Sequence, residues 1–319
     1  ALRGAGAHAL AVEAHDGHLT YGELDLRSSR MAGWLRTQGV EPGHRVGVCV
    51  PRSADTIVAL LAVARAQAVP VPLDATHPAA RLRRLVEDCD MRVVLAGGGG
   101  VEALERAGTR TPVLDLADAD GDGCLPEVAP CGGDVAYIIH TSGSTGRPKG
   151  VYVTHAGIAD MVASERRWCG VGEGTVVAQA ASPGFDASVL EVTMGLLTGA
   201  ACALITDEHR DSGGALVAEW ARLGVTHAFM VGSFALTLDP SSIPEGMTLV
   251  LGGEAFPAQF ATAVAGRTRL VNLYGPTEAT IFGTGHRLRG PHGVSVPIGK
   301  PVYGARLEVL DTTLRPVAP

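Results

Sequence analysis

The chain has 319 residues, of which 46% are hydrophobic and 18% are charged, and its formal net charge is −7. This composition is too apolar for an intrinsically disordered chain, and the acidic balance argues against a duplex nucleic-acid partner, since proteins that bind duplexes usually carry a basic face. The most apolar stretch, 56–64, is much shorter than the roughly 20 residues that span a bilayer, and no secretory signal opens the chain, so no membrane partner is predicted.

Short β-branched runs alternate along the chain with longer amphipathic runs. The short runs predict strands at 46–50, 69–73, 92–95, 113–116, 135–140, 176–180, 201–205, 226–231, 248–251, 269–273 and 306–310. The longer runs predict helices at 21–38, 53–66, 78–88, 155–167, 187–198, 214–223 and 257–264, with Ser53 and Thr154 as N-caps. Because strands alternate with helices, we expect an α/β fold with a mostly parallel sheet covered on both faces.

Two segments rich in glycine or in small polar residues interrupt this pattern. The glycine run 97–100 and the stretch 118–133 are predicted to be surface loops. Both are too short to separate independent domains.

Six cysteines are spread along the chain, and none has the spacing of a zinc site or of a C-x-x-C redox motif. They are Cys49, Cys89, Cys124, Cys131, Cys169 and Cys202. We predict that they are reduced thiols in a cytoplasmic protein.

The segment 140–150 departs from the alternation, because it places glycines, hydroxyl side chains and Lys149 between two β-like runs. Glycines let backbone N–H groups turn toward an anion, hydroxyls add donors and a lysine adds charge, so the segment is a candidate phosphate-binding loop. It is not a Walker A loop, since Gly150 follows Lys149. The only other lysine is Lys300, which favours a chemical role for Lys149 in a chain that otherwise uses arginine. A flexible hairpin tip would contain the same residue types and stays open as the alternative.

The segment 136–150 resembles the phosphate loop of the adenylate-forming enzymes, and six further segments match motifs of that family in order and spacing. They are 19–24, 69–74, 185–188, 251–254, 272–278 and 298–301. The similarity extends to the end of the chain and is greatest to the amino-acid-activating adenylation domains of nonribosomal peptide synthetases. The resemblance implies layered, mostly parallel sheets with helices on both faces, as in the large N-terminal domain of that fold.

The resemblance also implies an ATP site with a bound Mg²⁺ ion. The residues implied at the β- and γ-phosphates are Thr141, Ser142, Gly143, Ser144, Thr145, Gly146 and Lys149. Those implied at the adenine are Gly252, Gly253, Glu254, Asn272 and Tyr274, on which the ring would stack. Thr277 would contact the α-phosphate and Glu278 would ligate Mg²⁺, and the implied catalytic set is Thr145, Lys149, Thr277 and Glu278. The residues themselves leave two alternatives open, an ordinary turn at Gly252 and Gly253 and a helix start with Thr277 as N-cap.

The resemblance implies that Asp186 determines the class of substrate, because in the family the residue at this position binds the α-ammonium group of an amino acid. A partly buried carboxylate and an ammonium group can compensate each other's charge. Asp186 also precedes a predicted helix and could instead cap it. However, Ser188 and Glu191 have the spacing of a capping box, which would leave Asp186 free.

The same alignment of motifs places apolar residues around the substrate side chain. They are Phe185, Ala187, Leu190, Phe229, Val250, Gly252, Leu273, Ile281 and Phe282. A polar substrate side chain would be desolvated there without a partner, so we expect an apolar amino acid, and Leu190 with Phe229 suggests a branched aliphatic one. His140 and the segment 230–234 depart from the family pattern, in which a tyrosine and a proline-containing segment are common.

The implied reaction is attack of an amino-acid carboxylate on the α-phosphorus of ATP, which gives an aminoacyl-adenylate and pyrophosphate. In the family, a thioester then forms on the phosphopantetheine of a carrier protein domain, and a small accessory protein is a further partner to consider. The family's ribose-binding aspartate motif and small C-terminal domain do not occur in the sequence. We therefore expect residues 1–319 to be the large N-terminal domain, to bind ATP weakly and to turn over poorly alone.

Two other functions stay open. The same fold could activate a carboxylic acid that lacks the α-amine, as acyl-CoA and aryl-acid ligases do, and Asp186→Ala would then leave activity unchanged. A non-catalytic nucleotide-binding or scaffold module is the alternative from a different class, and the ordered set of motifs argues against it.

Overall fold

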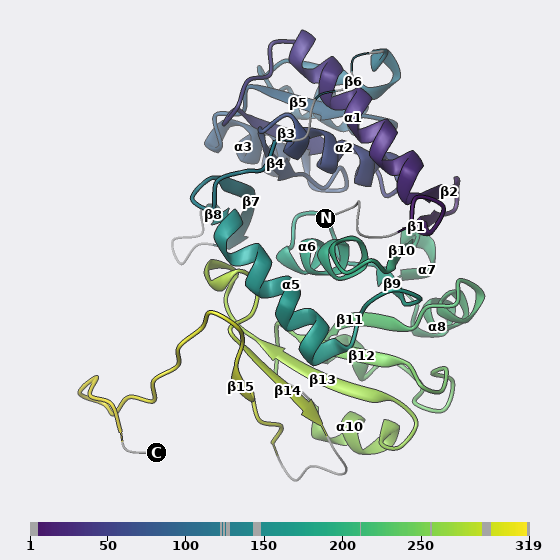
Figure 1. The fold of residues 1–319 in the computed structure, drawn as a ribbon, viewed down its shortest axis with the longest axis vertical. Coiled ribbons are helices and arrows are strands. Elements are labelled where there is room, and N and C mark those ends of the chain that lie inside the picture. Colours follow the sequence, from purple (N-terminus) through teal and green to yellow (C-terminus); the bar gives the residue numbers. More distant parts are fainter. Residues whose placement is uncertain are drawn as a thin grey trace.

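The computed structural model describes residues 6–121, 123, 125, 128–142, 148–210, 212–255, 257–288 and 295–317. In this part of the chain the strands form three sheets, of nine, four and two strands (Figure 1). Helices cover both faces of the two larger sheets, and most strand pairs in those sheets are parallel. The predicted α/β class is confirmed.

The first part of the chain builds the four-stranded sheet, which is entirely parallel. Its order is β4 (Val69–Pro72), β3 (Arg45–Cys49), β5 (Val93–Ala96) and β6 (Val113–Asp115). One face is covered by α1 (Tyr21–Thr37) and α2 (Ala54–Arg65), and the other by α3 (Ala79–Asp88) and α4 (Gly99–Ala107). Successive residues of β5 show why a continuous apolar run suits such a strand. Val93 and Leu95 pack beneath α1 and α2, whereas Val94 and Ala96 pack beneath α3 and α4.

Local sequence explains where the helices of this sheet begin. α1 starts with a capping box, in which Thr20 Oγ1 accepts the backbone N–H of Glu23 (3.2 Å) and the Glu23 carboxylate accepts that of Thr20 (2.8 Å). Ser53 and Thr154 are the N-caps of α2 and of α5 (His155–Cys169), as predicted.

The nine-stranded sheet contains the strands that position the candidate site. Its order is β15 (Lys300–Pro301), β14 (Thr284–Leu288), β13 (Arg269–Tyr274), β12 (Thr248–Gly252), β11 (His227–Val231), β9 (Val176–Gln179), β10 (Ala201–Leu204), β1 (Leu10–Ala14) and β2 (Gly17–Thr20). The six strands from β13 to β1 are parallel, and the strand pairs at both ends of the sheet (β13 with β14, β14 with β15, and β1 with β2) are antiparallel.

Helices from the second part of the chain cover this sheet. One face is covered by α8 (Gly213–Arg222), α9 (Gly232–Ala235) and α10 (Ala258–Val264). The other face is covered by α5 and by α6 (Asp186–Val192), which continues as a π-helical segment, Thr193–Leu197. A short helix, α7 (Asp207–Arg210), follows β10. The residues at the carboxyl ends of β9, β11, β12 and β13 therefore lie between two layers of helices.

The third sheet is the hairpin of β7 (Val135–Ser142) and β8 (Pro148–Thr154). The candidate phosphate loop connects these strands, and its residues 143–147 lie outside the described part of the chain. β7 packs against β4, and β8 packs against the 3₁₀ segment η4 (Thr277–Ala279). The hairpin therefore lies between the four-stranded sheet and the segment that follows β13 (Figure 1).

Several predicted elements were wrong or incomplete. The strand predicted at 306–310 does not form, because these residues have no neighbouring strand to pair with apart from an isolated bridge between Leu310 and Pro316, and Val309 is 72% exposed. The glycine run 97–100 is only partly a loop, since α4 begins at Gly99. The strands β1, β2, β14 and β15 and the helices α4, α7 and α9 were not predicted.

Five of the six cysteines lie within the described residues. Cys49, Cys89, Cys169 and Cys202 are buried, Cys131 is exposed, and all five are free thiols. Cys124 lies outside the described part of the chain. None of the described helices combines the length and apolar character that a membrane crossing would need.

Candidate active site

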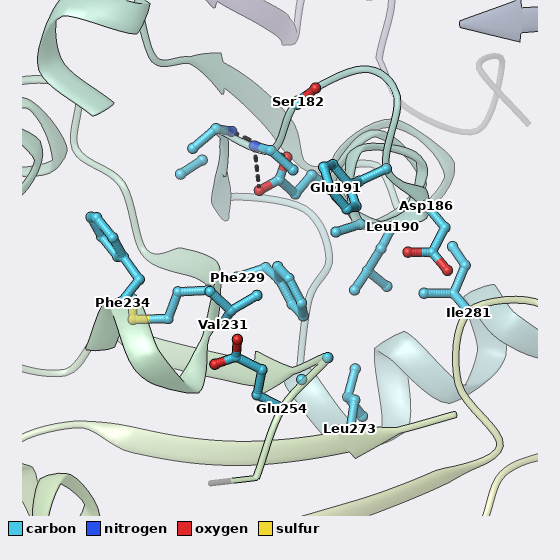
Figure 2. A pocket seen from close by; sticks show the side chains of 18 of the residues that line it. Ser182, Asp186, Leu190, Glu191, Phe229, Val231, Phe234, Glu254, Leu273 and Ile281 are labelled. Carbon is cyan, nitrogen blue, oxygen red and sulfur yellow. Dashed lines mark hydrogen bonds between the residues drawn. The ribbon is translucent and has the colours of Figure 1, made fainter. Parts of the chain in front are cut away.

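The candidate site lies where the order of strands in the nine-stranded sheet changes direction. β10 follows β9 on one side, and β11 lies on the other side of β9. Parallel α/β sheets bind ligands at the carboxyl ends of the strands beside such a point. β9 and β11 pair only between Val177 and His227, and a cavity of about 620 Å³ opens beyond the carboxyl ends of these strands (Figure 2).

Nearly all residues predicted around the substrate side chain line this cavity. They are Phe185, Asp186, Ala187, Leu190, Phe229, Gly252, Leu273, Ile281 and Phe282. Val250 is the exception, because it is fully buried in the core beneath α5 and α6 and is not part of the lining. Figure 2 shows Leu190, Phe229 and Ile281 around one side of the space, with Asp186 beside Ile281.

The cavity as a whole is less uniformly apolar than those residues predict. Its lining also includes the polar or charged residues Ser182, Glu191, Arg210 and Glu254, together with the apolar residues Trp220, Met230, Val231 and Phe234. None of these residues was predicted at a substrate side chain, although three of them come from the segment 230–234 that departs from the family pattern. In that segment Gly232 starts α9, and a Cβ on it would lie 2.6 Å from the carbonyl oxygen of Ala255. A glycine is therefore needed for the close approach of two backbones at this edge of the cavity.

Asp186 and Thr277 are in direct contact. Thr277 Oγ1 donates a hydrogen bond to Asp186 Oδ2 with an oxygen–oxygen distance of 2.5 Å. Burial raises the pKa of Asp186, whereas the hydrogen bond from Thr277 opposes that rise and the nearby charge of Glu278 adds to it. Thr277 is also not an N-cap, because η4 has Pro276 at that position. The structure therefore joins the residue predicted to bind an ammonium group to the residue predicted at the α-phosphate.

The capping box predicted at Ser188 and Glu191 does not form. The N-cap of α6 is Phe185, and Ser188 Oγ donates to the Phe185 carbonyl oxygen (2.7 Å) rather than capping an N–H group. The Glu191 carboxylate turns into the protein and accepts the backbone N–H groups of Ala180 (3.1 Å) and Ala181 (3.0 Å). Tertiary contacts to a preceding loop thus replace the local contact that the spacing predicts.

The turn that follows η4 holds its backbone in an unusual conformation. Thr280 and Ile281 have φ angles of 58° and 76°, in the left-handed region that β-branched residues rarely adopt. Gly275 allows this turn to pack closely, because a Cβ there would lie 2.5 Å from Phe282 Cα. Ile281 and Phe282 thereby reach the cavity wall. Such strain is often retained at binding sites, where the surrounding structure imposes it.

The residues predicted at the adenine lie on neighbouring strand ends, and their contacts differ. Tyr274 is 56% exposed at the end of β13 and is open to a stacking partner. Asn272 is buried and its Nδ2 donates to the Pro297 carbonyl oxygen (2.9 Å). Glu254 is exposed and accepts the backbone N–H of Ser233 (2.8 Å). Gly253 has a φ of 78°, so a turn that requires glycine is present there.

The phosphate-loop residues are only partly described. Thr141 and Ser142 end β7, and Lys149 lies in β8 opposite Thr141. Gly143, Ser144, Thr145 and Gly146 lie outside the described residues. Lys149 is exposed, and its strand packs against η4, which contains Glu278. Lys149 and Glu278 do not line the 620 Å³ cavity, but they belong to segments that contact each other beside it.

Glu278 has the properties that the predicted Mg²⁺ ligand needs. Its side chain is exposed and forms no ion pair with any described basic residue. Among the described residues there is no group of three or more histidine, cysteine, aspartate or glutamate side chains that could hold a metal by themselves. An exposed carboxylate such as that of Glu278 is a suitable ligand for Mg²⁺, which commonly binds through one or two carboxylates together with substrate phosphates and water.

Comparisons with known proteins identify related sequences. The model of a family described as AMP-binding enzyme matches residues 3–319. Phosphinothricin tripeptide synthetase PhsB from Streptomyces viridochromogenes is 40% identical over 100% of this chain and 28% of its own length. Bacitracin synthase 3 from Bacillus licheniformis is 32% identical over 96% of this chain and 5% of its own length. The chain thus spans only a minor part of these relatives.

Solved structures show the same fold. A four-domain nonribosomal peptide synthetase bound to AMP and glycine matches 98% of this chain and 23% of its own, with a TM-score of 0.86 and 28% sequence identity. The N-terminal subdomain of NpsA from Klebsiella oxytoca, in complex with 3-hydroxybenzoyl-AMSN, matches 98% of this chain and 81% of its own, with a TM-score of 0.82 and 23% identity. The second likeness is one of fold alone.

Proposed function

The chain belongs to the AMP-binding enzyme family, and we propose that it uses ATP to convert an amino acid into an aminoacyl-adenylate for nonribosomal peptide synthesis. Its relatives include synthetases of phosphinothricin tripeptide and bacitracin, and a structure with the same fold holds AMP and glycine. The observation that carries the proposal is the contact between Asp186 and Thr277 at the edge of the cavity.

The position of Asp186 favours an amino acid over other carboxylic acids. Its carboxylate lines the cavity and is partly buried, and burial raises its pKa. A substrate ammonium group beside it would compensate that charge and favour the ionised form. A carboxylic acid without the α-amine would leave Asp186 without this partner.

The reaction requires the carboxylate of the amino acid to lie in line with the bond between the α-phosphorus and its leaving oxygen. Attack of the carboxylate forms a C–O–P link and releases pyrophosphate with the bonding electron pair. Thr277 would orient the α-phosphate by turning its one hydroxyl proton from Asp186 to a phosphate oxygen, once the substrate ammonium group replaces it as the donor to Asp186. Lys149 and the rest of the phosphate loop would hold the β- and γ-phosphates, and most of the rate enhancement would come from orientation and charge stabilisation.

A magnesium ion would be held by Glu278 and the phosphates of ATP, and its chemistry would be neutralisation of phosphate charge. The exposed carboxylate of Glu278 and its position on η4, beside the hairpin strand β8, support this role.

The cavity wall supports an apolar substrate side chain, and we propose a branched aliphatic one. Leu190, Phe229, Leu273, Ile281 and Phe282 give the cavity much of its apolar lining, and Leu190 and Ile281 lie next to Asp186 (Figure 2). A polar side chain would lose its hydration there without a hydrogen-bond partner. Such a pocket separates aliphatic amino acids that differ by one methylene by only about 10- to 200-fold.

We also propose that residues 1–319 act as the large N-terminal domain of an adenylation domain in a cytoplasmic synthetase. The similarity to a minor part of much longer synthetases supports this organisation. The adenylate would be passed to the phosphopantetheine thiol of a carrier protein domain, and a small accessory protein is a further candidate partner.

The test is amino-acid-dependent exchange of pyrophosphate into ATP by the natural protein that contains this sequence. We expect exchange with a small set of apolar amino acids and none with the corresponding hydroxy acids. Exchange supported by hydroxy acids or aryl acids, but not by amino acids, would favour the alternative of an acyl-CoA or aryl-acid ligase.

A further inference from the structure

The loop 180–185 connects β9 to α6 and forms part of the cavity wall. Ala180, Ala181, Ser182 and Phe185 line the cavity, and the next residue is Asp186. The loop has no strand or helix of its own, so the position of Asp186 depends on what holds the loop.

The first residue that holds the loop in place is Glu191. It is fully buried and lies about one and a half turns after Asp186 in α6. Its carboxylate accepts the backbone N–H groups of Ala180 (3.1 Å) and Ala181 (3.0 Å) and the side-chain amide of Gln179 (3.2 Å). One carboxylate therefore fixes the beginning of the loop to the helix that the loop enters.

The second support comes from the other sheet. Arg52 lies between β3 and α2, and its side chain is only 6% exposed. Its Nη1 donates to Gln179 Oε1 (2.5 Å) and to the carbonyl oxygens of Gln179 (3.3 Å) and Ala181 (3.1 Å). Gln179 thus bridges a buried guanidinium group and the buried carboxylate of Glu191.

The third support also comes from the four-stranded sheet. Asp74 follows β4, and its carboxylate accepts the hydroxyl of Ser182 in the loop. The backbone N–H of Thr76 donates to Asp74 Oδ1 (2.9 Å) and holds that carboxylate in place. The loop is therefore fixed at its beginning by Arg52 and Glu191, and near its middle by Asp74.

We propose that Arg52, Asp74 and Glu191 are positioning residues for the amino acid, which set the place of Asp186 by fixing the loop 180–185 between the two sheets. Arg52 and Glu191 are both withdrawn from water. Arg52 also pairs with Asp207 (3.5 Å), whereas Glu191 depends on Arg52, so removal of the Arg52 charge leaves the Glu191 carboxylate without its compensation. The loop would then shift, and the ammonium site with it. The ATP segments on β8 and β13 are held by their own strand pairings, and η4 contacts Asp186 itself through Thr277 rather than the loop, so we expect the ATP site to change less than the ammonium site. The inference rests on the proposed function, because it assigns the three residues to amino-acid binding.

The test compares the KM for the preferred amino acid with the KM for ATP in pyrophosphate exchange. For Arg52→Gln we expect the amino-acid KM to rise at least about tenfold and the ATP KM to change less than about twofold. Asp74→Asn should produce the same split to a smaller extent, and Arg52→Lys should restore part of the amino-acid affinity.

Arg65→Gln is the matched control, since Arg65 lies at the other end of α2 and pairs with Asp25 of α1. Equal increases of both KM values in Arg52→Gln, or the same split in Arg65→Gln, would overturn the inference. So would unchanged KM values in Arg52→Gln and Asp74→Asn.

A second measurement does not depend on catalysis. Amide hydrogen exchange of the 319-residue chain should show faster exchange at Ala180 and Ala181 in Arg52→Gln than in the unchanged chain, and no such effect in Arg65→Gln. Unchanged exchange at these amides would overturn the inference by itself. Absence of amino-acid-dependent pyrophosphate exchange in the unchanged protein would instead refute the proposed function.

Discussion

Thr277 donates a hydrogen bond to Asp186 over 2.5 Å, although the two residues are 91 positions apart in the chain. Asp186 opens α6, and Thr277 opens η4 after β13. Their contact joins the side of the cavity proposed for the amino acid to the segment proposed for the α-phosphate. A carboxylate that binds at this boundary is close to both, which is the geometry that adenylation requires.

Replacement of Asp186 by asparagine should abolish most of the activity with amino acids. The side chain keeps its size and its hydrogen bond with Thr277 but cannot neutralise an ammonium group. We expect kcat/KM for the preferred amino acid in pyrophosphate exchange to fall by about 100-fold or more. The KM for ATP is the internal control and should stay within about twofold of its original value. Undiminished kcat/KM would show that Asp186 does not bind the ammonium group.

Thr277→Val should move the pH dependence of amino-acid use. The hydroxyl of Thr277 lowers the pKa of Asp186, and burial raises it, so loss of the hydroxyl leaves a higher pKa. Asp186 would then become protonated, and lose its attraction for an ammonium group, at a higher pH. We expect the acid limb of the plot of kcat/KM against pH to move to higher pH. Asp186→Asn should lack this limb, and an unshifted limb in Thr277→Val would contradict the assignment.

Phe229→Ala should change which amino acids are accepted. Phe229 projects into the middle of the cavity in Figure 2, and its removal enlarges the apolar space beside Leu190. We expect kcat/KM to increase about tenfold for larger apolar amino acids relative to the preferred one. Phe234→Ala is the control, because Phe234 lies on the opposite side of the cavity from Asp186 in Figure 2 and should leave this ratio unchanged. An unchanged ratio in Phe229→Ala would remove Phe229 from the substrate pocket.

Glu165 should make the protein less stable as the pH rises. Its side chain is fully buried, Thr193 Oγ1 donates to Glu165 Oε1 (2.8 Å), and burial raises its pKa well above 4.5. Below pH 4.5 both the folded and the unfolded chain carry the proton, and above it the folded chain retains the proton that the unfolded chain loses. The free energy of unfolding should therefore fall by up to about 1.4 kcal/mol per pH unit, until the pH exceeds the folded pKa.

Glu165→Gln should remove that contribution, because glutamine does not titrate. Urea unfolding of both chains between pH 5 and pH 8 measures the effect. The difference between the two free energies of unfolding should change steadily with pH in favour of the variant. Parallel pH profiles would show that Glu165 ionises in the folded protein as it does in water.

The alternation of short β-branched runs with amphipathic runs predicted most of the fold, because buried parallel strands must be apolar on both faces. β3, β5 and β9 are such strands. The pattern was misleading at 306–310, where an alternating run has no partner strand. It also missed α4, whose first residues, Gly99 and Gly100, have low helix propensity.

The site was less predictable from residues than from the family resemblance. No local pattern shows that Thr277 contacts Asp186 or that Ile281 has a positive φ, since both depend on how distant segments pack. Glu191 illustrates the same limit. Its spacing from Ser188 is that of a capping box, but its buried carboxylate binds the loop 180–185 instead.

The most direct measurement is a crystal structure of the chain with a non-hydrolysable aminoacyl-adenylate analogue of the preferred amino acid. We predict that its ammonium nitrogen lies within about 3 Å of an Asp186 carboxylate oxygen, and that the group replacing the phosphate lies beside Thr277. The side chain should contact Leu190 and Phe229. An analogue bound outside this cavity, or bound with its ammonium group away from Asp186, would contradict the account.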